Sequence, residues 1–323
     1  MTTPIVGYYG KLPISPEFFR LNASGPEVRW LDDWLQQGML YAKAKEGARW
    51  HELVDESDLW KFLYFPVDES RIVCGVLFAS RDKAGRSFPF LYFLLLDRKS
   101  LSRKVWLAPL MAAEFLDAAE CSLEGLRKNF AWDGFCQDVA SFNGRCLEVE
   151  SVSEVFGQYL RSEKADTWLA QGLGNSINSQ KLQLVRRLTD LIHSLKQDSG
   201  CRFPWGFNFP LLKQKGESDY DLAFWLAAIV RPIKARQLQA PGLFTLWNRS
   251  PKKVKPCALV SVGPGSPHII RFLVSPDAQD EAWRDMIQVE DMAEDFGETD
   301  EARLLSDPDL SLMGVLEYFE RLP

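Results

Sequence analysis

Two strongly apolar runs, separated by a short polar segment, lie within residues 71–98, RIVCGVLFASRDKAGRSFPFLYFLLLDR. The runs, 72–79 and 88–96, each have about the length of one buried strand and are rich in β-branched or aromatic side chains. Asp82 and Gly85 between them suit a turn, because aspartate can hydrogen-bond its own backbone and glycine can adopt positive φ. The pattern predicts a hairpin of two central strands, whose charged tip is either a binding site or, as these residues alone favour, a plain solvated turn. The tip would display three polar side chains: Ser80, Asp82 and Arg86.

Three strands in a row are expected in the first hundred residues, at 59–65, 71–79 and 88–96. The turns between them are short, and short turns favour antiparallel hairpins over crossovers, which need a dozen or more residues. A helix with a broad apolar stripe is expected before the strands, at 27–45, and a longer helix after them, at 105–130. The first half is therefore expected to be a sheet covered by helices, neither all-helical nor all-β.

The second half is expected to repeat this mixture of helices and strands. The expected elements are helices at 179–196, 219–230 (ended by Pro232) and 310–322, strands at 242–248, 257–263 and 268–274, and an irregular segment at 201–210. The run GLGNSINS, residues 172–179, is the best candidate for a flexible join. We therefore expect an N-terminal α/β domain over residues 1–170. A C-terminal α/β region over residues 171–323 would end in an acidic segment at 277–309 and a helix.

Charge and composition exclude several classes of function. The chain of 323 residues has a net charge of −6 at pH 7, whereas nucleic-acid binding needs a basic surface. No window approaches the roughly 20 apolar residues that span a bilayer, and the N-terminus lacks the pattern of a signal peptide. The six cysteines are scattered without a CxxC pair, as is typical of reduced thiols in a cytoplasm. We therefore expect a cytoplasmic protein that binds no nucleic acid and does not insert into a membrane.

Signatures of catalysis and of cofactor binding are missing from the sequence. There is no GxSxG motif, and Gly10 with Lys11 does not complete a phosphate-binding loop, because Leu12 follows the lysine where that loop has serine or threonine. The three histidines lie far apart, at positions 51, 193 and 268. We therefore expect no catalytic residue, no metal and no cofactor.

Two charged segments in the second half each allow two interpretations. The basic run RSPKKVK, residues 249–255, could meet a phosphorylated or acidic partner, or could be a solvated loop. The acidic segment at 277–309 could be a solvated surface, a loosely ordered segment or a docking site for a basic partner. The solvated interpretation is favoured for both.

Two groups of motifs stand out in the first hundred residues. The first group is GYYGKLP at 7–13, FFR at 18–20 and WLDDWL at 30–35, and the second is GVLFASRD at 75–82 and GRSFP at 85–89. Together they resemble the TagF family, also called ImpM, of proteins associated with bacterial type VI secretion. The family pattern at the second group is close to PSxDxxGRxFP, and Ala79 stands where that pattern has proline. The resemblance is specific over residues 5–96 and extends to about residue 130, whereas the acidic segment after Asp277 matches nothing in the family.

The resemblance implies a fold, a function and a partner. It implies a three-layer α/β sandwich with a largely antiparallel central sheet, in agreement with the pattern of elements above. It also implies a cytoplasmic, non-enzymatic regulator that represses assembly of the secretion machine by binding its forkhead-associated scaffold protein. The candidate binding residues in and beside these motifs are Lys11, Arg20, Ser80, Asp82 and Arg86.

A function of a different class also fits some of these residues. In a phosphate-ligand sensor or an enzyme, Lys11 and Arg86 could hold an oxyanion while Asp82 orients a donor or binds a metal. That hypothesis requires Lys11 and the hairpin tip to converge on one concave pocket. The simplest interpretation is that Asp82 and Arg86 pair with each other, or cap nearby backbone groups, and only shape the tip.

Overall fold

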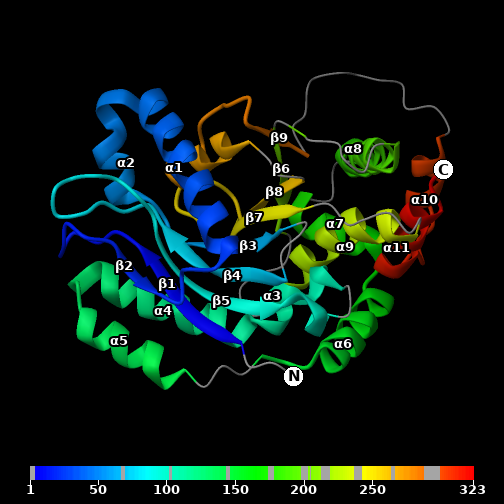
Figure 1. Ribbon diagram of the computed structural model, residues 1–323. Helices are drawn as coiled ribbons and strands as arrows, with labels where there is room; N and C mark the ends of the chain where they lie inside the picture. The colour runs from blue at the N-terminus through cyan, green and yellow to red at the C-terminus, as the bar shows by residue number, and fades with distance from the viewer. Residues whose placement is uncertain are drawn as a thin grey trace.

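A mixed sheet of nine strands runs through the middle of the molecule, with helices on both of its faces (Figure 1). The structure is a computed structural model of the chain. It describes residues 4–66, 70–101, 104–142, 146–173, 178–197, 203, 205–211, 219–235, 242–262, 266–286 and 299–323. The sheet and its two helical layers form the three-layer α/β sandwich that the sequence predicts.

The strand order across the sheet is β2-β1-β5-β4-β3-β7-β8-β6-β9. The strands are β1 (Ile5–Gly10), β2 (Phe19–Leu21), β3 (Trp60–Phe65), β4 (Arg71–Phe78), β5 (Phe90–Asp97), β6 (Gly206–Pro210), β7 (Leu243–Asn248), β8 (Cys257–Val262) and β9 (Trp283–Asp285). Neighbours are antiparallel except β6 and β9, which are parallel. The predicted three-strand meander is confirmed as β3-β4-β5.

The two halves of the chain share this one sheet, because β3 pairs with β7. The pairing runs from Lys61 opposite Trp247 to Phe65 opposite Leu243. The sheet thus contains strands from both sides of the domain boundary expected at residue 170. The division of the chain into two domains stays a prediction.

The central strands are buried on both faces, which is why their sequences are apolar runs rather than alternating patterns. Along β4, Ile72, Cys74 and Val76 pack into one hydrophobic core, and Val73 and Leu77 pack into the other. Each face of the sheet therefore has its own core and its own helical cover.

One helical layer covers the face of the sheet to which Ile72 points, and the other covers the face to which Val73 points. The first layer holds α3 (Ala108–Met111), α4 (Ala113–Asn129), α5 (Trp132–Ser141), α6 (Val149–Ser162), α7 (Ala165–Leu173), α8 (Asn178–Gln197), α9 (Tyr220–Ala235), α10 (Asp300–Leu305) and α11 (Leu312–Arg321). The second holds α1 (Pro26–Glu46), α2 (Trp50–Glu56) and the 3-10 helix η4 (Pro267–Leu273). Short 3-10 turns η1 (Gly47–Arg49), η2 (Arg98–Leu101) and η3 (Val105–Leu107) connect other elements. Figure 1 shows α1 and α2 on one side of the sheet and α4 and α5 on the other.

The prediction of a strand at 268–274 is wrong, because this segment forms the 3-10 helix η4. Pro267 stands at the start of η4, and the Ser266 side chain caps it by accepting a hydrogen bond from the His268 backbone. The β-branched residues Ile269 and Ile270 are buried against α1 rather than in the sheet. A capped start and tertiary packing thus outweigh strand propensity here.

Other expectations differ from the structure in their boundaries. Pro232 does not end its helix, because α9 continues to Ala235 with almost every side chain buried. The segment at 201–210, expected to be irregular, contains strand β6, and the helix expected at 105–130 is divided into η3, α3 and α4. Residues 174–177 of the proposed join and 287–298 of the acidic segment lie outside the described residues.

Candidate functional site

The carboxylate of Asp82 lies at the centre of the β4–β5 hairpin tip and is fully buried. Its Oδ1 accepts hydrogen bonds from the backbone N–H groups of Ala84 and Arg86, both at 2.9 Å. Its Oδ2 accepts from Lys11 Nζ at 3.0 Å and from Arg86 Nε at 2.7 Å. A carboxylate offers about four lone-pair sites, so these contacts fill its capacity as an acceptor.

Electrostatics at the tip keep Asp82 ionised. Burial opposes ionisation, but the hydrogen bonds from Arg86 and Lys11 outweigh it and lower the pKa of Asp82 to about 2. The positive φ of Gly85, 81°, allows the turn to close around the carboxylate. The turn that the sequence predicts is therefore confirmed. The buried Asp82 carboxylate stabilises it by accepting hydrogen bonds from its backbone.

The hairpin tip is held between the loop that follows β1 and helix α2. On the loop side, Arg86 Nη2 donates to the Pro16 carbonyl at 2.6 Å, and the Lys83 backbone donates to the Ser15 carbonyl at 3.1 Å. On the other side, Trp50 of α2 donates through Nε1 to Ser87 Oγ at 2.8 Å.

Ser80, another candidate residue, is buried, and its carbonyl accepts from the Phe88 backbone at 3.0 Å. The structure thus gathers Lys11, Ser80, Asp82 and Arg86 at the tip, where their hydrogen bonds are to one another and to the backbone. Arg86 keeps an exposed side chain.

Arg20 lies in a neighbouring open hollow of about 490 Å³ between β2 and the start of α1. The hollow is lined by Tyr9, Arg20, Asn22, Ala23, Ser24, Val28, Arg29 and Asp32. Burial and the negative charge of the adjacent Asp32 raise the pKa of Tyr9. An aromatic cluster connects the hollow to the tip, because Tyr9 and Phe88 both pack on Phe18, and Lys11 Nζ lies 4.9 Å from the Phe18 ring centroid. The five candidate residues therefore occupy two adjoining places rather than one pocket.

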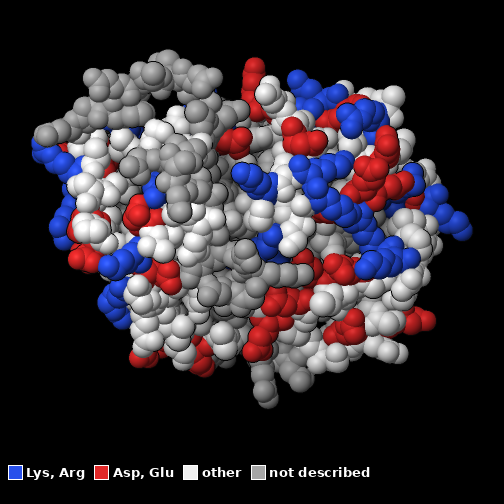
Figure 2. Space-filling view, turned by 180° about the vertical axis from the view of Figure 1, so that it is seen from behind, with Lys and Arg blue, Asp and Glu red and all other residues white. Residues whose placement is uncertain are grey.

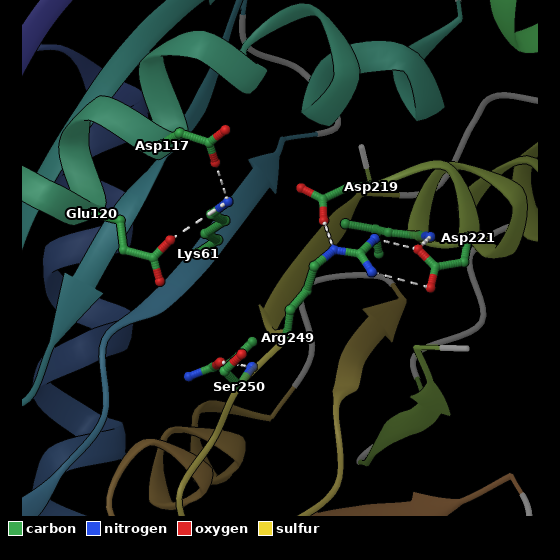
Figure 3. Close-up of polar contacts among 9 residues, drawn as sticks. Lys61, Asp117, Glu120, Asp219, Asp221, Arg249 and Ser250 are labelled. Carbon is green, nitrogen blue, oxygen red and sulfur yellow. Dashed lines mark hydrogen bonds and ion pairs between the residues drawn. The ribbon is translucent and has the colours of Figure 1, made fainter. Parts of the chain in front are cut away.

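A second polar cluster, which the sequence did not reveal, joins the end of β7 to the start of α9 (Figure 3). Arg249 lies between two buried carboxylates, with Nε 2.6 Å from Asp219 and Nη2 2.5 Å from Asp221. No spacing signal could have found this cluster, because its members lie far apart in the sequence. The DYD run at the start of α9 was its only trace.

Lys61 forms the neighbouring part of this cluster from strand β3. Its Nζ lies 2.7 Å from Asp117 and 3.7 Å from Glu120, both on α4 (Figure 3). Burial lowers the pKa of Lys61, but the charges of Asp219 and these two carboxylates outweigh it and raise that pKa. The cluster thus fixes α4 and α9 against the sheet.

The basic loop at 249–255 uses much of its charge within the molecule. Besides Arg249, Lys252 lies 3.4 Å from Asp58 and Lys253 lies 3.3 Å from Glu56. Figure 2 shows acidic and basic side chains interspersed on the face that it displays. These contacts favour the interpretation of the loop as a structural element rather than a docking site.

The described part of the chain contains neither a metal-binding cluster nor a membrane-spanning helix. In that part no group of three or more His, Cys, Asp or Glu residues is placed to hold a metal ion. Likewise, no helix there combines the length and the hydropathy needed to cross a bilayer.

A family model described as "TagF N-terminal domain, Type VI secretion system-associated" matches residues 7–142. This stretch is therefore similar to a TagF N-terminal domain. It extends from within β1 to the end of α5, and it contains the hairpin tip, the hollow and all five candidate residues. The resemblance to TagF that the motifs predicted is confirmed, and the match continues beyond those motifs to α4 and α5.

Comparison with solved structures gave the crystal structure of PA0076 from Pseudomonas aeruginosa PAO1. The two chains are 19% identical with a TM-score of 0.49, and the similarity covers 85% of this chain and 96% of that one. Comparison with curated proteins gave no match. The assignment to TagF therefore rests on the family model and on the motifs inside it.

Proposed function

We propose that this protein is a cytoplasmic, non-enzymatic regulator that represses assembly of a type VI secretion system by binding the forkhead-associated scaffold protein of that system. The observation that supports the proposal is the TagF N-terminal domain over residues 7–142, whose family is associated with type VI secretion. The remaining steps, repression and the choice of the scaffold as partner, follow from the family resemblance.

The geometry of the tip also favours a binding protein over an enzyme or a phosphate-ligand sensor. Lys11 and Arg86 do converge on Asp82, but they converge on a carboxylate whose acceptor sites are already occupied. To act on a ligand, Asp82 would have to give up contacts that hold its own turn together. A surface used for protein binding needs no such change.

Direct binding is the first test. The purified chain and the purified scaffold protein of the same secretion system would be mixed and titrated calorimetrically. We expect saturable binding with defined stoichiometry, and the scaffold's isolated forkhead-associated domain would show whether that domain suffices. Failure of the full-length scaffold to bind would contradict the proposed partner.

Repression is tested separately in cells. Overproducing the chain in the bacterium that encodes it is expected to reduce the number of assembled secretion machines, counted by fluorescence microscopy of a labelled sheath subunit. If the chain acted as a catalyst instead, one molecule of it could inactivate several scaffold molecules. The loss of assembled machines would then be larger than the amount of scaffold bound to the chain explains. An unchanged number of assembled machines would contradict the repressor hypothesis.

A further inference from the structure

Strand β2 lies at one edge of the sheet and is well exposed. It pairs with β1 through Tyr8 opposite Leu21 and Tyr9 opposite Arg20. In the described part of the chain, no strand pairs with its outer side. An edge strand offers unpaired backbone N–H and C=O groups to another extended segment.

One face of β2 is basic. Arg20 lies on the same face of the sheet as Tyr9, above the hollow, and Arg29 from the first turn of α1 lines the hollow as well. Both arginines are exposed, and among the described residues neither has a carboxylate within ion-pair distance. Asp32, the acidic residue of the hollow, already accepts a hydrogen bond from Gln36. The two guanidinium groups are therefore available to an outside anion.

The opposite face of β2 is apolar. Phe19 and Leu21 point there, because side chains alternate along a strand and Arg20 takes the other face. The Phe19 ring packs on Trp132 of α5, with centroids 4.3 Å apart, and Leu21 is 37% exposed. We call Phe19, Leu21 and Trp132 the β2 ledge.

We propose that β2 and the ledge receive an extended segment of a partner protein that alternates acidic and apolar side chains. Added as a strand beside β2, such a segment would place its acidic side chains toward Arg20 and Arg29 and its apolar ones on the ledge. This proposal rests on the proposed function in one respect, namely that the chain acts by binding a protein. It adds which kind of segment the chain would bind and through which residues.

Charge decides between this occupant and a second copy of the chain. Antiparallel pairing of two β2 strands would bring Arg20 of one copy close to Arg20 of the other, and like charges across strands are destabilising. A segment with carboxylates at alternate positions has the complementary charge. Such a segment would be attracted by the two arginines at this site, although the protein as a whole has a net charge of −6.

Other candidate sites fit a ligand less well. The apolar cavity among α7, α8, α9 and α11 has a volume of only about 20 Å³, too small for an organic ligand. The charges of the α4–α9 cluster, and those of Arg249, Lys252 and Lys253 in the basic loop, are paired internally.

The test uses the full chain and two synthetic probes. A fluorescein-labelled nine-residue peptide that alternates valine and glutamate is titrated with the protein, and anisotropy reports binding. A valine–lysine peptide of the same length is the charge control. We expect the glutamate peptide to bind the wild-type chain at least about tenfold more tightly than the lysine peptide, because the surface favours negative charge.

Variants locate the binding. Arg20→Glu combined with Arg29→Glu should weaken the glutamate peptide at least about tenfold and reverse the preference toward the lysine peptide. Leu21→Asp should weaken it through the apolar face. The matched controls are Arg49→Glu, in η1 after the end of α1, and Leu40→Asp, a 69% exposed leucine in the C-terminal half of α1, and neither should change binding. Circular dichroism verifies that each variant is folded.

The outcomes separate the two proposals. Equal binding of both peptides, no binding of the glutamate peptide, or binding unaffected by the β2 variants would each overturn the docking surface. Titration of the scaffold protein runs in parallel with the same variants. If the peptide results hold but the scaffold does not bind, the surface stands and the proposed function fails. If the scaffold binds the wild-type chain and the Arg20→Glu/Arg29→Glu variant equally, the proposed function stands and the proposed docking surface fails.

Discussion

Replacing Asp82 by asparagine removes the charge at the centre of the hairpin tip while preserving the shape of the side chain. All four groups around the carboxylate are donors: Lys11 Nζ, Arg86 Nε and the backbone N–H groups of Ala84 and Arg86. Asparagine offers one oxygen and one NH₂ group. Whichever way the amide is turned, its NH₂ group faces two donors and leaves both without an acceptor.

The size of the effect follows from which donors can reach water. The Arg86 side chain is 61% exposed and can be hydrated, whereas the Lys11 side chain is only 9% exposed. Asp82 is the carboxylate with which Lys11 forms its ion pair, so the substitution leaves a nearly buried cation without it. Breaking a buried pair on one side costs about 3–5 kcal/mol of unfolding free energy, and we expect a loss in that range.

Urea denaturation followed by tryptophan fluorescence measures this loss as a lower midpoint with an unchanged slope. Asp55→Asn is the matched control, because Asp55 also anchors the tip, through Arg81 at 2.7 Å, but both side chains of that pair are at least one-third exposed. An exposed ion pair contributes about 0–1 kcal/mol, so the control should lose no more than that. Equal losses for the two variants would refute the assignment of Asp82 as the buried centre of the tip.

The pH dependence gives an independent check with a defined sign. The pKa of Asp82 is lowered from 3.8 to about 2 in the folded protein, so folding favours the ionised form. Its contribution is therefore fully present above the unfolded pKa and is lost as the pH falls toward 2. The difference in stability between wild type and Asp82→Asn should be constant above about pH 5 and should shrink below pH 4. A constant difference down to pH 2.5 would contradict this reasoning.

Four further substitutions test other parts of the structure, three by the same denaturation assay and the fourth by hydrogen exchange. Gly38→Ala should destabilise the protein although alanine is the better helix former, because the new Cβ would lie 2.3 Å from the Pro267 carbonyl oxygen. Gly125→Ala, with nothing within 4 Å of its Cβ position, should stabilise it by about 0.5–1 kcal/mol, and the opposite order would contradict the packing of α1 on η4. Arg249→Met removes the cation between two buried aspartates and should cost about 3–5 kcal/mol; a loss under 1 kcal/mol would show that the cluster of Figure 3 is dispensable. Lys196→Met removes the buried ammonium that donates to the Leu322 carbonyl, so hydrogen exchange should become faster in the last turn of α11 and stay unchanged in β4.

The parts of the fold that the sequence predicts well are those with long apolar runs. The strands β3, β4 and β5 are recognisable because burial on both faces requires continuous apolar sequence. Strands β2 and β9 have three residues each, too few for any periodicity to show. Their pairing is decided by contacts with β1 and β6, which no local pattern encodes.

The η4 segment shows how a correct reading of propensity can give the wrong element. HIIRFLV has the β-branched and aromatic composition of a strand. The structure instead uses Ser266 and Pro267 to start a 3-10 helix, in which residues three apart share one side. Ile270 and Leu273 are such a pair, and both are buried in the core that also contains α1.

The sequence favoured the arrangement found at the hairpin tip, in which Asp82 and Arg86 pair with each other and cap backbone groups, but it left a ligand site open as an alternative. The sequence indicated that Asp82 and Arg86 belong to a turn, and that Lys11 could join them. Whether the carboxylate faced outward, to a ligand, or inward, to the turn, depended on contacts between residues 71 positions apart. The two arginines of the hollow share no motif spacing, because a strand supplies one and a helix supplies the other.

The pairing of β3 with β7 has a consequence for how the protein is made. The outer edge of β3 is completed only by a strand that lies about 180 residues later in the chain, and synthesis of that length takes roughly 10 to 35 seconds at bacterial rates. During this interval the first part of the nascent chain would present an open, apolar strand edge. We therefore expect the growing chain to depend on ribosome-associated chaperones, and fragments that end near residue 142 to aggregate unless a complementary strand is supplied in trans.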